Sequence, residues 1–178
     1  MAENWDMKRN ALLTPLPPED WDESIQHIAQ RLGNPLNIHR MIAHNPALME
    51  AYTPLRYHVV QDSALTGRQR ELLILRVAYR IDSDYEWRHH VVRGKAAGLS
   101  EVEIERVKEG GQAAGWAADE RHILDCVDQV IAEQQLTEET AAGLLKAVGA
   151  EGLLDAIFTV SVYLALGSVL RTFDVPSD

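Results

Sequence analysis

The chain contains little cysteine and comparatively few basic residues. Cys126 is the only cysteine among 178 residues, so neither an intramolecular disulfide nor a CxxC redox pair can form, as is typical of a reducing compartment. The 17 lysines and arginines face 27 acidic residues, which gives a formal net charge of -10. This sign is wrong for a protein that neutralises phosphates. We therefore expect no nucleic-acid partner, whereas a small anion held by local arginines stays compatible with the composition.

Two targeting patterns are also missing from the sequence, and we expect neither a signal peptide nor a membrane span. Residues 1–10 contain charged and amide side chains and no apolar core, unlike a secretory leader. The longest apolar stretch, residues 156–170, is shorter than the roughly 20 residues that a membrane span requires, and it predicts a buried helix. We expect a cytoplasmic protein without a membrane partner.

Strand signals are nearly absent, whereas helix signals are abundant. No sustained two-residue alternation and no Asn-Gly or Asp-Gly hairpin turn occurs. Three capping boxes predict helix starts: Thr66 with Gln69, Ser83 with Glu86, and Ser100 with Glu103. Glycines that follow amphipathic runs predict helix ends at Gly33, Gly98 and Gly149. The sequence thus predicts an all-α protein with helices over 19–32, 37–43, 46–62, 67–81, 84–97, 101–109, 117–134, 138–148 and 151–171.

The length fits a single domain. Residues 1–18 contain three prolines and predict an extended N-terminal arm of the kind that often lies on a partner subunit, and residues 19–178 form the helical domain. The helices at 67–81 and 151–171 are apolar on nearly all sides, which is typical of buried helices. Two such helices in so short a chain predict a homo-oligomer that covers part of the apolar surface.

The main candidate chemistry lies in residues 85–90, Tyr-Glu-Trp-Arg-His-His. Glu86 and His90 are four residues apart and share one face of the predicted helix. The imidazole of His90 could exchange protons near neutral pH, with Glu86 as its partner. Alternatively, Glu86 completes the capping box of Ser83 and bonds the helix start, and His90 is an ordinary core or surface histidine. Both alternatives stay open.

A metal site is another interpretation of this segment. The spacing of Glu86 and His89 is that of di-iron carboxylate bundles, and Asp119 with His122 repeats it with a shorter acid. The further inward carboxylates that such a site needs do not stand out, and no zinc-type cluster of histidines is present. We therefore predict no metal site and no cofactor. No Ser-His-Asp pattern, P-loop or GxGxxG motif occurs either.

A second carboxylate, Glu71, lies on an apolar line of the helix predicted over 67–81, with Leu75 and Ala78. Its burial would raise its pKa unless an arginine or a histidine pairs with it. The polar face of this helix is basic and could hold a carboxylated substrate. For two of its arginines, Arg70 and Arg80, we favour salt bridges to solvent-facing or intersubunit partners.

These residues resemble the carboxymuconolactone decarboxylase family, which belongs to the all-α superfamily of alkylhydroperoxidase D proteins. The resemblance spans about residues 35–176 and rests mainly on the stretches LTGRQREL at 65–72, LRVA at 75–78, YEW at 85–87 with His90, and AAGLS at 96–100. It implies an alkylhydroperoxidase D-like helical bundle that assembles as a homotrimer or a hexamer.

The resemblance also implies site residues. Glu71 and His90 match the family's glutamate and histidine, whereas the CxxC of the peroxidase branch would fall at Ser83 and Glu86. Without these thiolates, thiol-dependent peroxidase chemistry is not expected. What remains is a cofactor-independent lyase or isomerase of aromatic catabolism that acts on a small carboxylated or lactone substrate.

In such a reaction, loss of carbon dioxide leaves a carbanion, and the resemblance implies that His90 protonates it on carbon. Glu71 would tune the imidazole and Glu86 would move a proton or position the ring. Tyr85 and Trp87 would line the substrate site, and Arg68 would hold a carboxylate or the lactone carbonyl. Because one fold hosts several chemistries, two alternatives stay open: a non-catalytic ligand-binding or assembly protein, and a metal-dependent oxidoreductase that uses Glu86, His89 and His122.

Overall fold

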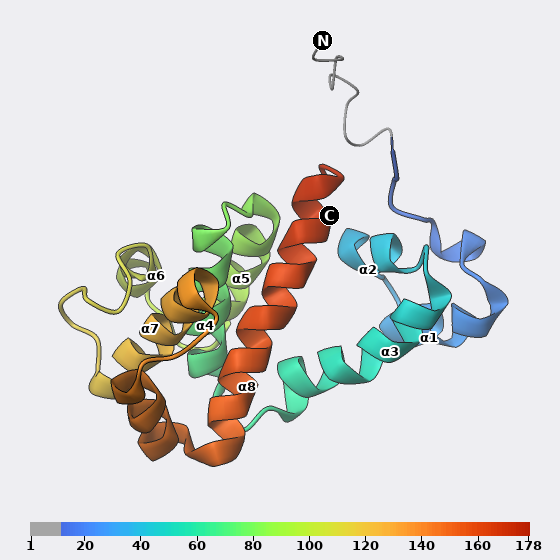
Figure 1. Ribbon diagram of the computed structural model, residues 1–178. Helices are drawn as coiled ribbons and strands as arrows, with labels where there is room; N and C mark the ends of the chain where they lie inside the picture. The colour runs from blue at the N-terminus through green and yellow to red at the C-terminus, as the bar shows by residue number, and fades with distance from the viewer. Residues whose placement is uncertain (1–11) are drawn as a thin grey trace, which may run out of the picture. The chain divides into compact units, whose positions relative to one another are not determined.

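The computed structural model describes residues 12–178, and every regular element in this part of the chain is helical (Figure 1). The all-α prediction is therefore confirmed. Short 3₁₀ segments at Pro18–Asp20 and Glu23–Ile25 precede the first α-helix, and a π-helical turn at His58–Asp62 follows the third. The α-helices are α1 (Gln26–Leu32), α2 (Asn37–Ile42), α3 (Pro46–Tyr57), α4 (Gly67–Arg80), α5 (Asp84–Ala96), α6 (Glu101–Val107), α7 (Ala118–Glu133) and α8 (Glu138–Thr172).

Most predicted helix boundaries are confirmed to within one or two residues, and three differ for local reasons. The helix predicted over 19–32 begins as 3₁₀ turns, where the Asp22 side chain caps Ser24. The helix predicted over 46–62 contains Pro54, which has no N–H to donate, and its last turn is π-helical. The two helices predicted after residue 137 are continuous as α8, with a kink at Gly149, whose φ is 73°. Figure 1 shows the change of direction at this kink.

The chain forms two compact units. One comprises the residues up to His58 together with Ser168–Asp178, and the other comprises Val59–Gly167. In the first unit, the backbone N–H of Asn37 donates to the Asp178 carboxylate over 2.6 Å. The predicted N-terminal arm lies partly in residues 1–11, outside the described residues. Residues 12–17 form no helix, and the Leu16 N–H donates to the Arg40 carbonyl over 3.2 Å.

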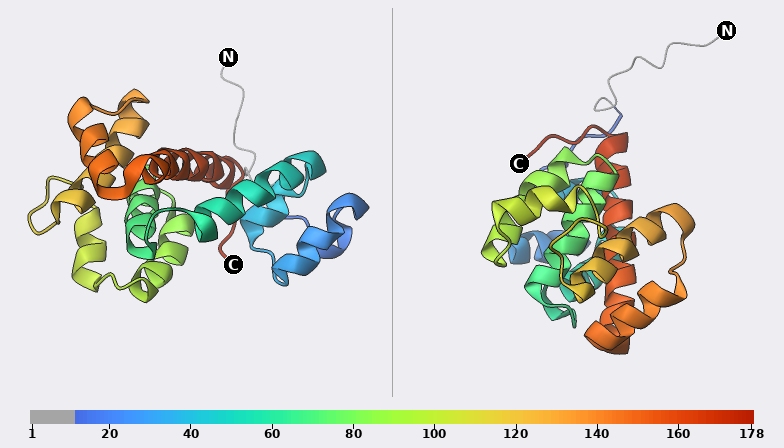
Figure 2. Two further views of the ribbon diagram at one scale, coloured as in Figure 1. Left: turned by 90° about the horizontal axis from the view of Figure 1, so that it is seen from below. Right: turned by 90° about the vertical axis from the view of Figure 1, so that its left-hand side faces the viewer.

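In the second unit, α4 packs against α5, α6 and α7 (Figure 2). All residues from Glu71 to Ala78 are buried, as the apolar pattern predicts. The charge of Arg76 is compensated, because its Nε and Nη2 donate to the Asp128 carboxylate over 2.9 and 2.8 Å and its Nη1 donates to the Val107 carbonyl over 2.9 Å. A buried cation that is paired in this way ties α4 to α7 and to the end of α6.

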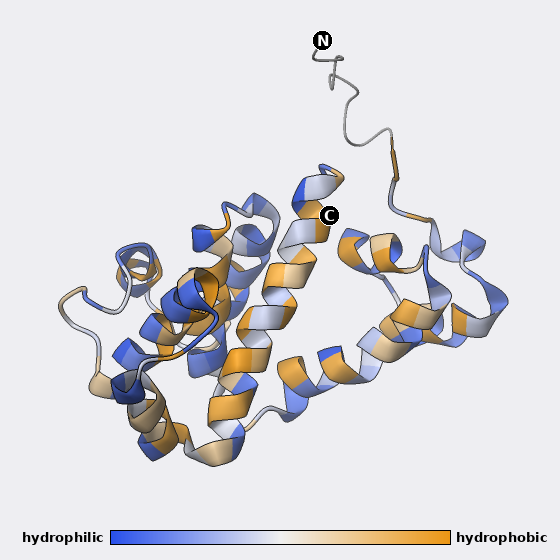
Figure 3. Cartoon of the chain, in the orientation of Figure 1, coloured by the Kyte–Doolittle hydropathy of each residue, from blue (hydrophilic) through white to orange (hydrophobic). Residues whose placement is uncertain are grey.

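The last helix, α8, carries apolar residues along most of its length (Figure 3). It is long and apolar enough to cross a membrane by length and composition alone, and 44% of its most apolar window is buried inside the protein. Core helices meet the same criterion. Ala156 and Val160 are fully buried, whereas Leu154 and Phe158 are 58% and 55% exposed. One face of α8 therefore serves the core of the second unit, and another presents large apolar side chains at the surface.

Candidate active site

A pocket of about 350 Å³ lies in the second unit, between α4, α5 and α8. Its charged and aromatic lining comes from Arg70 and Glu71 of α4, His90 and Arg93 of α5, and Tyr163 of α8. Small and aliphatic residues complete the lining: Val60, Gly67, Ile74, Ala96 and Ala97. The pocket thus combines a titratable centre with two cationic side chains.

The centre of the site is a hydrogen bond between two buried side chains. Nδ1 of His90 lies 2.6 Å from Oε2 of Glu71, and the two side chains are 2% and 5% exposed. Glu71 has a second partner, because its Oε1 lies 3.7 Å from Nε of Arg70. The sequence predicts that a buried Glu71 needs an arginine or a histidine, and the structure provides both. Tyr163 packs edge-on against the imidazole, with ring centroids 5.1 Å apart.

The second imidazole nitrogen faces two charged groups. Nε2 of His90 lies 3.5 Å from Nη1 of Arg93 and 3.5 Å from Oε2 of Glu86. Because the Glu71 carboxylate accepts a hydrogen bond over 2.6 Å, we assign the proton of the neutral imidazole to Nδ1 and the lone pair to Nε2. In this tautomer the basic nitrogen is the one next to Arg93, and Glu71 holds the ring in place.

Burial lowers the pKa of His90 below its ordinary value of 6.5, and the nearby charges of Arg93 and His89 act in the same direction. The hydrogen bond and the charge of Glu71 oppose this shift. The imidazole is therefore neutral at pH 7. In the resting protein His90 is poised to accept a proton at Nε2 rather than to donate one.

Glu86 does not complete a capping box. In such a box its carboxylate would accept from the backbone N–H of Ser83, but this N–H already donates to a carbonyl of α4. Ile81 ends α4, Asp82 follows with a left-handed φ of 54°, and the N–H of Ser83 donates to the Ala78 carbonyl over 2.9 Å. This is a Schellman motif, and it satisfies the N–H that a capping glutamate would bond. The Ser83 hydroxyl still accepts from the Glu86 N–H over 3.4 Å. The Glu86 side chain is 6% exposed, and its Oε2 lies 3.5 Å from Nε2 of His90.

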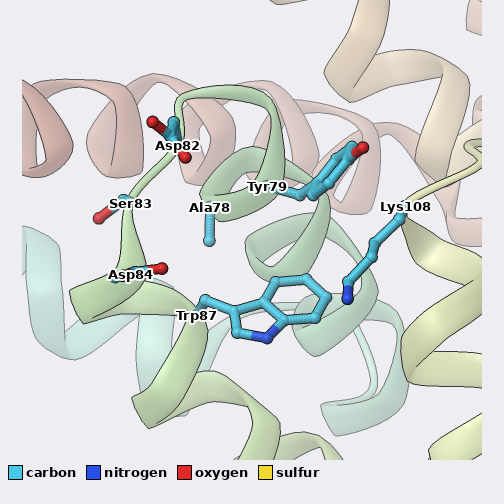
Figure 4. A pocket seen from close by; sticks show the side chains of 7 residues that line it. All are labelled: Ala78, Tyr79, Asp82, Ser83, Asp84, Trp87 and Lys108. Atoms are coloured by element: carbon cyan, nitrogen blue, oxygen red, sulfur yellow. The ribbon is translucent and has the colours of Figure 1, made fainter.

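The three residues that the sequence predicts for substrate binding do not line this pocket. The Arg68 guanidinium forms ion pairs with Glu103 and Glu120, the latter over 2.7 Å. Tyr85 is buried and stacks on His89, with ring centroids 4.7 Å apart. Trp87 lines a separate pocket (Figure 4). Arg68 is instead a structural contact from α4 to α6 and α7, because two acids that follow it in the sequence converge on it.

The pocket around His90 is lined by two arginines and a tyrosine that the sequence analysis did not select: Arg70, Arg93 and Tyr163. Arg93 follows His90 by three residues, so helical spacing alone could have placed it on the same face. Arg70 precedes Glu71 and carries no comparable signal. Tyr163 arrives from a helix that is distant in the chain, and only the tertiary packing brings it to His90.

The residues of the metal-site alternative do not come together. His89 stacks on Tyr85, whereas the ring of His122 lies against Gly143 in α8, so closely that a Cβ at position 143 would come within 2.3 Å of it. Within residues 12–178 no group of three or more His, Cys, Asp or Glu side chains is arranged to hold a metal ion. We assign no metal ligands.

The lone thiol is remote from this chemistry. Cys126 lies in the interior of α7 and is fully buried. Burial raises the pKa of its thiol to about 12. Since the thiolate is the reactive form, Cys126 is not a nucleophile at neutral pH, and Ser83 and Glu86 provide no substitute for a redox pair.

Comparison with known proteins agrees with the resemblance in the sequence. Residues 46–129 match the model of the carboxymuconolactone decarboxylase family, and they contain Glu71, Glu86 and His90. This segment belongs to the family. No curated protein matches the sequence significantly.

Solved structures share the fold of this chain at low identity. A peroxidase-related protein from Ralstonia eutropha with an alkylhydroperoxidase core superposes with a TM-score of 0.76 at 15% identity, over 93% of this chain and 91% of that one. A protein of unknown function from Agrobacterium tumefaciens gives 0.68 at 22% identity, over 76% and 93%. A debrominase in complex with 2,3,4-tribromopyrrole gives 0.71 at 16% identity, over 94% and 91%. These similarities establish the alkylhydroperoxidase D-like fold.

Proposed function

We propose that this protein is a cofactor-independent proton-transfer enzyme, a lyase or an isomerase, that acts on a small carboxylated or lactone substrate in the His90 pocket. The observation that carries the proposal is a neutral, buried imidazole whose Nδ1 is bound by Glu71 over 2.6 Å while its Nε2 stays basic. A general base needs this combination of a fixed tautomer and a free nitrogen in a pocket.

The tautomer determines the order of proton transfers. In an isomerisation, Nε2 takes a proton from the carbon next to the substrate carbonyl, and the negative charge of Glu71 stabilises the resulting imidazolium. The Nε2 proton exchanges with solvent before the imidazolium protonates another carbon of the delocalised anion. In a decarboxylation, loss of carbon dioxide leaves a carbanion that the imidazolium protonates on carbon, and His90 must first take up that proton from solvent. Because the pKa of His90 is lowered, the neutral imidazole predominates, and proton abstraction is favoured as the first step.

Two guanidinium groups favour a negatively charged substrate. Arg70 and Arg93 both line the pocket, and Arg93 forms no ion pair with a carboxylate in the described part of the chain. A half-buried arginine without an anionic partner is suited to hold a substrate carboxylate or the oxyanion that develops at a lactone carbonyl. In this role Arg93 and Arg70 replace Arg68.

The direct experiment is incubation with a carboxylated muconolactone in D₂O. Carbon-bound deuterium is followed by NMR and carbon dioxide release by gas analysis, so both reactions are detected in one sample. We expect deuterium incorporation or carbon dioxide release above the rate in buffer. His90→Gln should lower this rate by about 10²-fold or more, the usual contribution of a general acid or base.

His89→Gln is the matched control, because His89 is the neighbouring histidine and stacks on Tyr85 outside the pocket. It should leave the rate unchanged. A rate that is the same in His90→Gln as in the unmodified protein would contradict the assignment. If the lactone protects the protein against thermal unfolding while no deuterium or carbon dioxide appears, the non-catalytic binding function replaces the enzymatic one.

A further inference from the structure

A second pocket, of about 220 Å³, lies where α4 ends and α5 begins (Figure 4). It shares no lining residue with the His90 pocket. Its lining consists of Ala78, Tyr79, Asp82, Ser83, Asp84, Trp87 and Lys108. Three of these side chains are charged (Asp82, Asp84 and Lys108), and two are aromatic (Tyr79 and Trp87).

The charges are separated across this pocket. Asp82 and Asp84 lie on one side, Lys108 lies on the other, and the indole of Trp87 lies between them (Figure 4). The Asp82 carboxylate forms no ion pair within residues 12–178, and Asp84 has only a distant partner, Arg88, at 3.9 Å. The acidic side of the pocket is therefore open to a cation.

The indole ring of Trp87 already contacts an ammonium group, that of Lys108. Nζ of Lys108 lies 5.0 Å from the centroid of the Trp87 ring, within the range of a cation–π contact. The Tyr79 ring lies 6.3 Å from Trp87, centroid to centroid, at an angle of 58°. The two rings form an apolar corner that could hold a short hydrocarbon chain, and Lys108, which also pairs with Glu105 over 2.7 Å, could turn to bind an anion.

Asp82 is a costly residue for the fold. It occupies the left-handed position of the Schellman motif that ends α4. At the corresponding position after α5 the chain has a glycine, Gly98, with φ of 90°. Its negative charge lies between the C-terminus of α4, where the helix dipole disfavours anions, and the N-terminus of α5, where the dipole favours them. Asp174, with φ of 49°, has the same backbone conformation after α8. Asp82 differs from it because its carboxylate lines a pocket beside a second acid and an aromatic corner.

We propose that this pocket binds a small zwitterion, with its ammonium group at Asp82 and Asp84, its carboxylate at Lys108, and its apolar linker on Trp87 and Tyr79. The separation of charge across the pocket carries the proposal: a simple cation would face the ammonium group of Lys108, and a simple anion would face two carboxylates. The site is independent of proton transfer at His90.

The test uses the full-length protein and ω-amino acids with one to five methylene groups, from glycine to 6-aminohexanoate. Fluorotryptophan labelling gives a ¹⁹F NMR signal for each of the four tryptophans, and the signal of Trp87 is assigned by its loss in Trp87→Phe. We expect saturable shifts of the Trp87 signal with an optimum chain length, because Asp82 and Lys108 lie on opposite sides of the pocket and only a linker of matching length reaches both. The alkylamine and the alkanoate of that length should bind about tenfold or more weakly, the equivalent of one lost charge-assisted contact.

Asp82→Asn separates binding from folding, because asparagine tolerates the left-handed conformation and removes only the charge. It should weaken binding of the best ω-amino acid about tenfold or more, while the melting temperature changes by no more than about 2–4 °C. Asp174→Asn is the matched control and should leave binding unchanged. Three results would overturn the proposal: no saturable shift of the Trp87 signal, equal affinity for the alkylamine, or unchanged binding in Asp82→Asn.

Discussion

Nδ1 of His90 and Oε2 of Glu71 are 2.6 Å apart and join α5 to α4 in the interior of the second unit. Because this bond occupies Nδ1, any substrate in the pocket meets His90 through Nε2. The buried carboxylate also gains a compensating partner, which a carboxylate in an apolar helix requires. The same contact therefore serves folding and the proposed chemistry, and mutations at either end should reveal both.

The stability of the fold should depend on pH through His90. Burial lowers its pKa below 6.5 in the folded protein, so between the folded pKa and 6.5 the unfolded state binds more protons. In this window the free energy of unfolding rises with pH, and stability is lost as the pH falls below 6.5. Urea unfolding between pH 5 and 8 should show this slope. In His90→Gln the slope should be smaller, and an identical slope would show that His90 does not titrate differently in the two states.

The rate of the proposed reaction should also follow His90. If proton abstraction comes first, deuterium exchange into the lactone requires the neutral imidazole, so its rate rises with pH through the folded pKa and is constant above about 6.5. If the protonated imidazole is the reacting form, the rate falls with rising pH instead. A pH–rate profile thus distinguishes abstraction first from protonation first. His89→Gln should keep the direction of the profile and move its midpoint slightly upward, because it removes a charge that lowers the pKa of His90.

Glu71→Gln should disturb the tautomer of His90. The amide keeps a hydrogen-bond acceptor but loses the charge that stabilises the imidazolium, so we expect a fall in rate of about 10 to 100-fold, as for other residues that orient a histidine. The measurement that separates this role from packing is ¹⁵N NMR of the His90 ring, in which the Nδ1 and Nε2 shifts report the tautomer. Unchanged shifts together with an unchanged rate would show that Glu71 is only structural.

Ser83→Ala and Glu86→Gln should act independently. Removing the Ser83 hydroxyl should lower the free energy of unfolding by about 1 kcal/mol through loss of the α5 cap. Glu86→Gln should leave this cap intact and change the pH–rate profile of His90, since its Oε2 lies 3.5 Å from Nε2. In the double variant the change in the free energy of unfolding should equal the sum of the changes in the two single variants to within about 0.5 kcal/mol. Strong coupling would restore the capping-box interpretation of Glu86.

The exposed face of α8 should be an oligomer contact. Leu154 and Phe158 are one helical turn apart and more than half exposed, and exposed apolar pairs of this size are typical of protein interfaces. We expect a trimer or a hexamer by light scattering coupled to size exclusion, and dissociation to smaller species in Phe158→Glu. Val102→Glu is the control, because Val102 is a single exposed apolar residue, 67% exposed, on α6. A monomeric unmodified protein would refute the expectation.

The sequence contains enough local information to place most helices and the central pair of the site. Capping residues and glycines mark where α4 and α5 begin and end, and helical periodicity puts Glu71 on the buried face of α4 and His90 four residues after Glu86. These features depend on neighbours within about one turn.

The remaining features depend on contacts between distant segments. Arg68 turns away from the pocket because Glu103 and Glu120, from two later helices, bind it. Tyr163 reaches His90 only because α8 packs there. The sequence therefore supplies the right residue types but cannot decide which arginine of α4 meets a substrate. That choice is made by tertiary packing rather than by helix propensity.

The Schellman motif at the end of α4 has a consequence for position 86. The backbone N–H of Ser83 is satisfied by a carbonyl of the preceding helix, so the start of α5 does not need the side chain three residues later. The Glu86 side chain contributes to the surroundings of His90 instead, with its Oε2 3.5 Å from Nε2. A carboxylate, an amide or a thiol could occupy position 86 without loss of a helix cap. Reaction chemistry at this site can therefore change by one substitution while the scaffold that presents it stays the same.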